Sequence, residues 1–300
     1  MFARKKEKVM SNLKWIVGGF LAVVVVWGFV RMEIVEKEDG ESSVAALAKY
    51  NNAIYPEVAE KIEIEQREIH SVKDIEPITG KKVKPIDYLN AISLDTLPVK
   101  EKKQYFIDLI LPAILIAKEE YKEMLDWVNE VSVKKDSLTG LEKERLAGMM
   151  EKFRAKNVKD LKVRLVTHPT SIVLAQASIE SGWGTSRFFV KANNIFGVWS
   201  FNPNDPRIPT LSHRNGKKMY LYKYKTLSAS VNDYFKLLAT RQPFAKFREE
   251  RVKTKDPYKL VEYLTAYSER GEAYVNDLKT QIRHNNFTKY DTYTLDKEAD

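Results

Sequence analysis

One short stretch of the chain combines residue types that suit acid catalysis. It is SIESGWGTSRFF at 178–189, in which Glu180 stands just before a Gly-Trp-Gly bend at 182–184. A general acid that works near neutral pH must keep its proton until the reaction. The pKa of a carboxyl is raised by the negative end of a helix dipole. It is also raised by desolvation, which neighbouring rings such as Trp183 and Phe188 would cause. We therefore expect Glu180 to be a proton donor. The competing interpretation is an exposed glutamate at a frayed helix end.

A helix has to hold Glu180 in place. Pro169 suits the start of that helix, where a missing N–H costs nothing. Ile172 and Ile179 then fall on one helix face. Gly182 permits the left-handed conformation that closes a helix, so Glu180 should lie in the last turn.

A β-hairpin is the next predicted element. Asn215-Gly216 stands between two strand-like runs, which is the usual chemistry of a tight hairpin turn. Tyr220, Tyr222 and Tyr224 alternate with other residues, and the period of a strand aims all three at one side. They form either a binding stripe or, for one or two of them, part of the core.

Helices fill most of the remaining chain. The apolar stretch 104–131 is helical in pattern, with Pro112 expected to kink or split it. Thr139 and Glu142 form a capping box that opens a helix through about Phe153. Further helical patterns lie at 229–241, 258–271 and 272–286. The expected fold class is α+β and mainly helical, with a small β-hairpin lobe and a groove between the two parts.

The stretch Ala175–Gly197, AQASIESGWGTSRFFVKANNIFG, resembles the signature of the glucosaminidase domain of glycoside hydrolase family 73, the mannosyl-glycoprotein endo-β-N-acetylglucosaminidase-like domain. The match covers about 85–291, and its closing helices and preceding helix most resemble the bacterial Bax-type branch. The resemblance implies a lysozyme-like fold. It also implies cleavage of the β-1,4 bond after N-acetylglucosamine in peptidoglycan, without a cofactor or metal.

The resemblance also implies roles for individual residues. Glu180 would be the general acid, and Tyr267 would contact the sugar under attack. The other predicted substrate-binding residues are Trp183, Asn193, Asn194, Phe196, Tyr220, Tyr222 and Tyr224. The two asparagines have a second interpretation, in which their short amides fix the loop.

A second carboxylate is normally needed on the far side of a glycosidic bond. Family members often carry it on the hairpin lobe, where this chain has Tyr220. The remaining candidates are Asp205, Asp233 and Glu269, and each also fits a purely structural position. An acetamido group of the substrate that acts as internal nucleophile would make all three unnecessary.

The composition limits the partners. The chain has 300 residues, no cysteine and a formal net charge of +9. Without cysteine there is no disulfide or thiolate chemistry, and a metal site of the usual zinc type is not expected. The positive charge suits an anionic environment such as nucleic acid, lipid headgroups or an acidic wall polymer.

The N-terminal segment favours the last of these partners. Basic residues precede the apolar run Trp15–Val30, and acidic residues follow it. By the positive-inside tendency, residues 15–30 would cross the inner membrane once, with the N-terminus cytoplasmic and the catalytic domain in the periplasm. A cleaved signal peptide is the competing interpretation. An exported domain seldom meets nucleic acid, so peptidoglycan glycan strands are the expected partner; the oligomeric state stays open.

The expected organisation has three parts. Residues 1–31 form a cytoplasmic basic tip and membrane anchor, 32–84 a juxtamembrane spacer, and 85–300 the glucosaminidase-like domain, with its catalytic core at about 165–290. Two alternative functions remain. One is a lytic transglycosylase, which also uses a lone glutamic acid. The other is a non-catalytic peptidoglycan-binding or scaffold protein.

Overall fold

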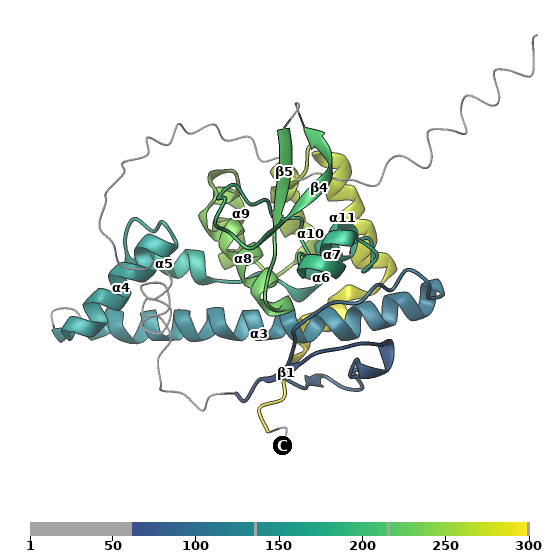
Figure 1. Cartoon of the computed structure of the whole chain (residues 1–300). Coiled ribbons are helices and arrows are strands. Elements are labelled where there is room, and N and C mark those ends of the chain that lie inside the picture. Colours follow the sequence, from purple (N-terminus) through teal and green to yellow (C-terminus); the bar gives the residue numbers. More distant parts are fainter. Residues whose placement is uncertain (1–61, 135–136, 215–216, 299–300) are drawn as a thin grey trace, which may run out of the picture.

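The computed structural model describes residues 62–134, 137–214 and 217–298 (Figure 1). The predicted membrane anchor at 15–30 and the predicted turn at Asn215-Gly216 lie outside these ranges. Within them, no helix has both the length and the apolar character needed to cross a bilayer.

The described chain is mainly helical with short strands, as expected for the α+β class. Its longer helices are α3 (Val99–Lys134), α4 (Gly140–Lys152), α5 (Val158–Leu165), α6 (Thr170–Glu180), α8 (Leu227–Thr240), α9 (Ala245–Lys253) and α11 (Glu272–His284). Shorter helical pieces are α7 (Arg187–Ala192), η3 (Gln242–Phe244), α10 (Pro257–Leu260), η4 (Val261–Tyr267) and η5 (Phe287–Thr292). The pattern predicted as one helix at 258–271 is thus divided between α10 and the 3-10 helix η4.

Two helices form the centre of the molecule. In α3 every residue from Phe106 to Ala117 is buried, and in α6 every residue from Thr170 to Ser178 is buried. A helix that is buried all round must be covered by other elements on every side. Helices α5, α6 and α8 pack against α3, and α11 and η5 pack against α6. The α3 helix runs through Pro112 without a break, so the predicted split does not occur.

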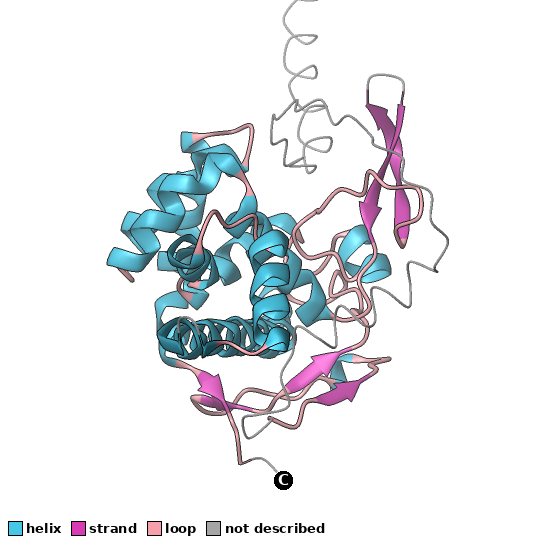
Figure 2. Cartoon of the chain, turned by 90° about the vertical axis from the view of Figure 1, so that its left-hand side faces the viewer, coloured by secondary structure: helices cyan, strands magenta, loops and turns pink. Residues whose placement is uncertain are grey.

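A layer of short strands covers the face of α3 opposite the other helices (Figures 1 and 2). Strand β1 (Glu65–Arg67) pairs in parallel with β3 (Ile86–Tyr88), and β2 (Lys82–Val83) pairs in parallel with β6 (Thr294–Leu295). The two ends of the described chain therefore meet in this layer.

This layer corrects part of the predicted spacer at 32–84. Ile69, Ile75 and Val83 are at most 4% exposed and belong to the same core as the helices. The described part of the spacer is therefore an integral piece of the folded domain, and a start at Pro85 is too late. Strands of two or three residues show too little alternation to be detected by periodicity.

The predicted hairpin is present as β4 (Arg207–Arg214) and β5 (Lys217–Tyr222), paired antiparallel. It projects from the helical body on the side away from the short strands (Figure 2). The register shifts between Pro209 and His213, which marks a bulge or irregularity in β4. The capping box predicted at Thr139 and Glu142 is also present, at the start of α4.

Candidate active site

Helix α6 is anchored at the end remote from Glu180. Its N-cap residue, Pro169, offers no side-chain hydrogen bond to the helix. Asp291 of η5 does so instead: its carboxylate accepts hydrogen bonds from Ser171 N at 2.7 Å and Ser171 Oγ at 2.9 Å. Because α6 is also buried along its length, Glu180 at its C-terminal end has a fixed position.

A left-handed turn follows Glu180 directly. Gly182, Trp183 and Gly184 have φ values of +58°, +58° and +82°. The conformation is costly for tryptophan, and for Gly184 any side chain would collide with the core, because a Cβ atom there would lie 2.9 Å from Leu94 Cδ1. Gly184 therefore permits a close approach of this turn to the core.

The carboxyl of Glu180 is strongly desolvated, although the residue as a whole is partly exposed. Tyr274 donates a hydrogen bond from its hydroxyl to Glu180 Oε1 at 2.8 Å. Burial raises the pKa of Glu180 to about 7, against the opposing effects of the Tyr274 hydrogen bond and the Arg270 charge. A carboxyl with this pKa can hold its proton near neutral pH, and the role of Glu180 as proton donor stays a prediction.

Tyrosine rings, contributed by three elements, stand behind this carboxyl. Tyr267 of η4 stacks on Tyr274 of α11 at a centroid distance of 5.6 Å, and its edge meets Tyr234 of α8 at 6.2 Å. All three are at most 1% exposed. Burial raises the pKa of each hydroxyl far above its usual range, and the carboxyl of Glu180 acts in the same direction, so the hydroxyls keep their protons.

The buried position of Tyr267 corrects its predicted role. With 1% of its surface exposed, it supports Tyr274 and does not present a ring to a sugar. Tyr274, which touches Glu180, was not predicted. Gln176 was also missed: it is buried in α6, one turn before Glu180, and it donates a hydrogen bond to Tyr274 at 3.1 Å. A lone amide in an otherwise apolar helix face, four residues before the acid, was the available signal.

The two asparagines among the predicted sugar-binding residues have structural roles. The Asn193 side chain accepts a hydrogen bond from Ala91 N and donates to backbone carbonyls, including Leu89 O at 2.8 Å. The Asn194 side chain likewise bonds only backbone groups in the contacts recorded for it, at Val198 and Tyr222. Both asparagines thus fix the loop, which was the second interpretation of these residues.

Phe196 and Trp183 are also packing residues. Phe196 is 1% exposed and stacks on Tyr234 at 4.1 Å, so the predicted sugar contact is not available to it. Trp183 meets Phe106 of α3 at 5.4 Å and Phe287 of η5 at 5.9 Å. Its ring therefore packs between two helical elements, and the aromatic residues found next to Glu180 are tyrosines. Because Trp183 is partly exposed, its predicted contact with the substrate stays a prediction.

The tyrosine stripe divides between core and surface. Tyr224 is 6% exposed and donates its hydroxyl hydrogen to Asp233 Oδ2 at 2.7 Å. Tyr222 and Tyr220 are partly exposed, and the Arg207 guanidinium lies 4.0 Å from the Tyr220 ring centre. One of the three rings is thus core, and the other two remain predicted binding residues.

The three candidate second carboxylates fall into two places. Asp205 accepts a hydrogen bond from Ser200 Oγ at 2.9 Å, and Asp233 accepts one from the Tyr224 hydroxyl at 2.7 Å. Burial raises the pKa of Tyr222, and the charges of Asp205 and Asp233 add to this effect, so both aspartates lie on the hairpin side of the molecule. Glu269 is exposed, on the loop after η4.

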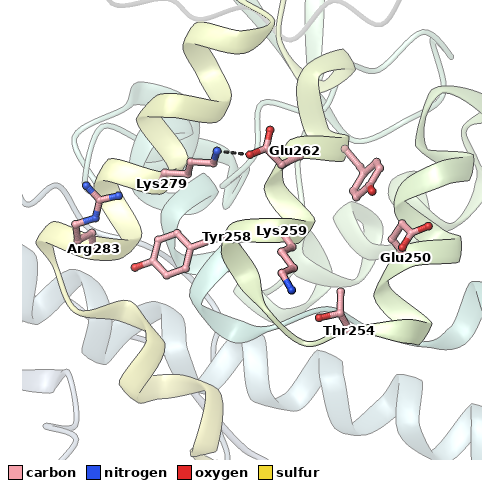
Figure 3. A pocket seen from close by; sticks show the side chains of 8 residues that line it. Glu250, Thr254, Tyr258, Lys259, Glu262, Lys279 and Arg283 are labelled. Carbon is pink, nitrogen blue, oxygen red and sulfur yellow. Dashed lines mark hydrogen bonds and ion pairs between the residues drawn. The ribbon is translucent and has the colours of Figure 1, made fainter.

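A cavity of about 480 Å³ lies elsewhere on the molecule, between α9, α10, η4 and α11 (Figure 3). An ion pair between Lys279 and Glu262 crosses its wall. Its lining mixes both signs of charge and includes none of the residues around Glu180. In the part of the chain that the structure describes, no group of three His, Asp or Glu side chains is arranged to hold a metal ion.

The region around Glu180 is similar in sequence to a known protein family. Residues 155–287, which contain Glu180 and the tyrosines around it, match the family model Glucosaminidase, described as mannosyl-glycoprotein endo-beta-N-acetylglucosaminidase. The chain carries a glucosaminidase-like domain. The matched range begins before α5 and ends at the start of η5.

Two curated proteins resemble the glucosaminidase-like domain. Protein bax of Escherichia coli (strain K12) is 28% identical over 123 residues, which are 39% of this chain and 43% of bax. Exo-glucosaminidase LytG of Bacillus subtilis (strain 168) is 29% identical over 130 residues, which are 40% of this chain and 45% of LytG. The chain thus spans less than half the length of either relative.

Solved structures of similar proteins are more distant. The catalytic domain of the autolysin Auto (Lmo1076) from Listeria monocytogenes is 20% identical, with 51% of this chain and 98% of that domain covered and a TM-score of 0.35. A glycoside hydrolase domain from Salmonella typhimurium FlgJ is 20% identical, with 46% and 97% covered and a TM-score of 0.33. At these TM-scores the likeness carries no argument about this chain, and the lysozyme-like arrangement stays a prediction.

Proposed function

We propose that this protein is a peptidoglycan hydrolase that cleaves the β-1,4 bond after N-acetylglucosamine, with Glu180 as the general acid. The observation that carries the proposal is the state of Glu180. Its carboxyl has a pKa of about 7 and accepts one hydrogen bond from Tyr274, and the residue is partly exposed within a glucosaminidase-like domain. A carboxyl of this kind can protonate the oxygen of a departing sugar near neutral pH.

The second catalytic group belongs to the hairpin side of the site. We favour Asp205 and Asp233 over Glu269 because their charges act on Tyr222, one of the two partly exposed tyrosines of the hairpin that remain predicted substrate contacts. A substrate acetamido group remains the alternative. Asp205→Asn and Asp233→Asn distinguish these options: a loss of turnover as deep as that of Glu180→Gln identifies the partner, and full activity in both favours the acetamido group.

The decisive experiment compares wild type with Glu180→Gln on purified peptidoglycan. We expect the variant to lose at least about 100-fold in turnover, the usual contribution of a positioned general acid. Glu144→Gln, an exposed glutamate on α4, is the matched control and should retain full activity. Equal inertness of wild type and Glu180→Gln, with both still bound to peptidoglycan, would favour the non-catalytic scaffold.

The products identify the reaction. A hydrolase leaves reducing N-acetylglucosamine ends, whereas a lytic transglycosylase leaves anhydro-muramyl ends. We propose endo cleavage, which yields fragments of mixed length from the first minutes. Release of only the smallest fragments from chain ends would instead indicate exo cleavage, the activity in the name of LytG.

We also propose that the protein is anchored in the inner membrane through residues 15–30, with the glucosaminidase-like domain in the periplasm. The order of charge around the apolar run supports this orientation. Accessibility of a cysteine introduced at Ser42 to a membrane-impermeant thiol reagent in intact spheroplasts tests it, and protection of that cysteine would contradict it.

A further inference from the structure

Four buried side chains connect Glu180, at the end of α6, to the loop before α6. Starting from the loop before α6, His168 Nε2 lies 2.8 Å from the Tyr234 hydroxyl, which lies 2.5 Å from Gln176 Oε1. Gln176 Nε2 then lies 3.1 Å from the Tyr274 hydroxyl, which lies 2.8 Å from Glu180 Oε1. The first four residues are at most 1% exposed.

The amide of Gln176 gives this series a single direction. Its oxygen can only accept, so the Tyr234 hydroxyl donates to it. Its nitrogen can only donate, so the Tyr274 oxygen accepts there and the single Tyr274 proton is left for Glu180. Since Tyr234 has used its own proton, its oxygen can only accept from His168.

His168 is in the state that this direction requires. Burial lowers its pKa well below the usual range, and the positive charges of Arg251 on α9, Lys118 on α3 and Lys255 after α9 act in the same sense. The ring is therefore neutral and carries one proton. Nδ1 has no hydrogen-bond partner within the described residues, and Nε2 faces Tyr234, so the proton belongs on Nε2.

We propose that His168, Tyr234 and Gln176 are positioning residues that hold the Tyr274 hydroxyl as a permanent donor to Glu180 Oε1. This inference rests on the proposed function of Glu180 as the acid. Because Oε1 is occupied, the transferable proton belongs on Oε2. After that proton has left, the Tyr274 hydrogen bond stabilises the carboxylate that remains, and a directed series of hydrogen bonds strengthens it.

Other groups also act on Glu180 and must be kept constant in a test. Arg270, on the loop before α11, favours the carboxylate by its charge, and the Arg270 side chain is held by an ion pair with Asp277. Burial and the charge of Glu180 both raise the pKa of the Tyr267 and Tyr234 hydroxyls, so these groups stay neutral. Burial is the largest influence on the pKa of Glu180 itself. The test therefore leaves Arg270 and Asp277 unchanged.

The experiment measures the pKa of Glu180 directly in the full-length chain, by infrared titration of its carboxyl band. Loss of that band in Glu180→Gln identifies it among the other buried carboxyls. In Tyr274→Phe we expect the pKa to rise by about one to two pH units, the effect of losing one hydrogen bond to a charged group. In Tyr234→Phe we expect a rise of about 0.3–0.6 unit, since one link of a cooperative series is lost.

Two further variants complete the design. His168→Phe keeps a ring among aromatic neighbours while it removes the donor, so it should give the same small rise even if Tyr234→Phe folds poorly. Tyr88→Phe is the matched control: Tyr88 is fully buried and its hydroxyl accepts from Glu76 N, outside the series. It should leave the Glu180 pKa unchanged.

The proposal is overturned if Tyr274→Phe shifts the pKa but Tyr234→Phe and His168→Phe do not, because the effect would then end at Tyr274. It is also overturned if nitrogen NMR of histidine-labelled protein finds the His168 proton on Nδ1. Neither measurement needs turnover, so a protein that fails to cleave peptidoglycan would refute the proposed function and leave this result standing. In an active protein, the alkaline limb of the rate profile should follow the measured pKa.

Discussion

The raised pKa of Glu180 predicts a cost in stability that a single substitution should relieve. The pKa is 4.5 in the unfolded chain and about 7 in the fold, so the folded state binds this proton more tightly. The contribution of the carboxyl to stability is therefore fully present below about pH 4.5 and is lost as the pH rises through about 7. At 1.36 kcal/mol per unit, the loss is at most about 3 kcal/mol.

Glu180→Gln removes the ionisation and keeps an oxygen that can accept from Tyr274. We expect the variant to be more stable than wild type by up to about 3 kcal/mol at about pH 8, which corresponds to a melting temperature some 6–12 °C higher for a domain of this size. Near pH 4.5 the difference should disappear. Urea unfolding and thermal melts at both pH values measure it.

The matched control is Glu144→Gln, in which an exposed glutamate on α4 is neutralised. A surface change of this kind should alter stability by no more than about 0.5 kcal/mol at either pH. If Glu180→Gln is no more stable than wild type at the higher pH, or is more stable by the same amount at both pH values, the folded state does not disfavour the charged form of Glu180 and the argument is refuted. A stabilised but inactive variant would show that the site gives up stability for its chemistry.

Four further substitutions test local contributions to stability, near the site and at a remote helix cap. Gly184→Ala should lower the free energy of unfolding, measured in urea, by about 2–3 kcal/mol, because its φ is +82° and its new Cβ would lie 2.9 Å from Leu94. Gly197→Ala should lower it by only about 1–2 kcal/mol, because its φ is +67° but the space around it is open. Asn193→Ala should cost about 2–4 kcal/mol, since several buried backbone groups lose their partner. Thr139→Ala should cost about 1 kcal/mol, the value of one helix cap, and leave the pKa of Glu180 unchanged.

Local signals in the sequence were enough to predict the element that carries the acid. The proline before α6 and the glycine after it predicted a helix with Glu180 in its last turn, and the structure confirms this, with Glu180 as the last residue of α6. The two strands of the hairpin and the cap of α4 were equally local and are also confirmed. Each depends on residues within a few positions of one another, which is the range over which residue type controls backbone conformation.

The surroundings of the acid could not be predicted in this way. Tyr274 lies 94 positions after Glu180, and Tyr234 reaches Gln176 from another helix 58 positions away. No spacing rule connects such residues, because the packing of α6, α8 and α11 alone brings them together. The same limit explains the asparagines at 193 and 194: residue type indicated a polar contact, but only the fold determines whether the amide faces a ligand or a backbone.

The identity of the residues behind Glu180 has a chemical consequence that a purely apolar pocket would not have. Phenylalanine in place of Tyr274 would desolvate the carboxyl equally well and raise its pKa further. A weaker acid transfers its proton less readily, however, and the carboxylate left after the transfer would have no hydrogen-bond donor. A buried tyrosine excludes water with its ring and still offers one proton, which its own raised pKa keeps in place. The two effects oppose each other on Glu180, and their balance at about 7 leaves the group both protonated before the reaction and stabilised after it. For this reason we expect the rate of proton transfer from Glu180 to depend on the hydroxyl of Tyr274 as well as on the desolvation of the site.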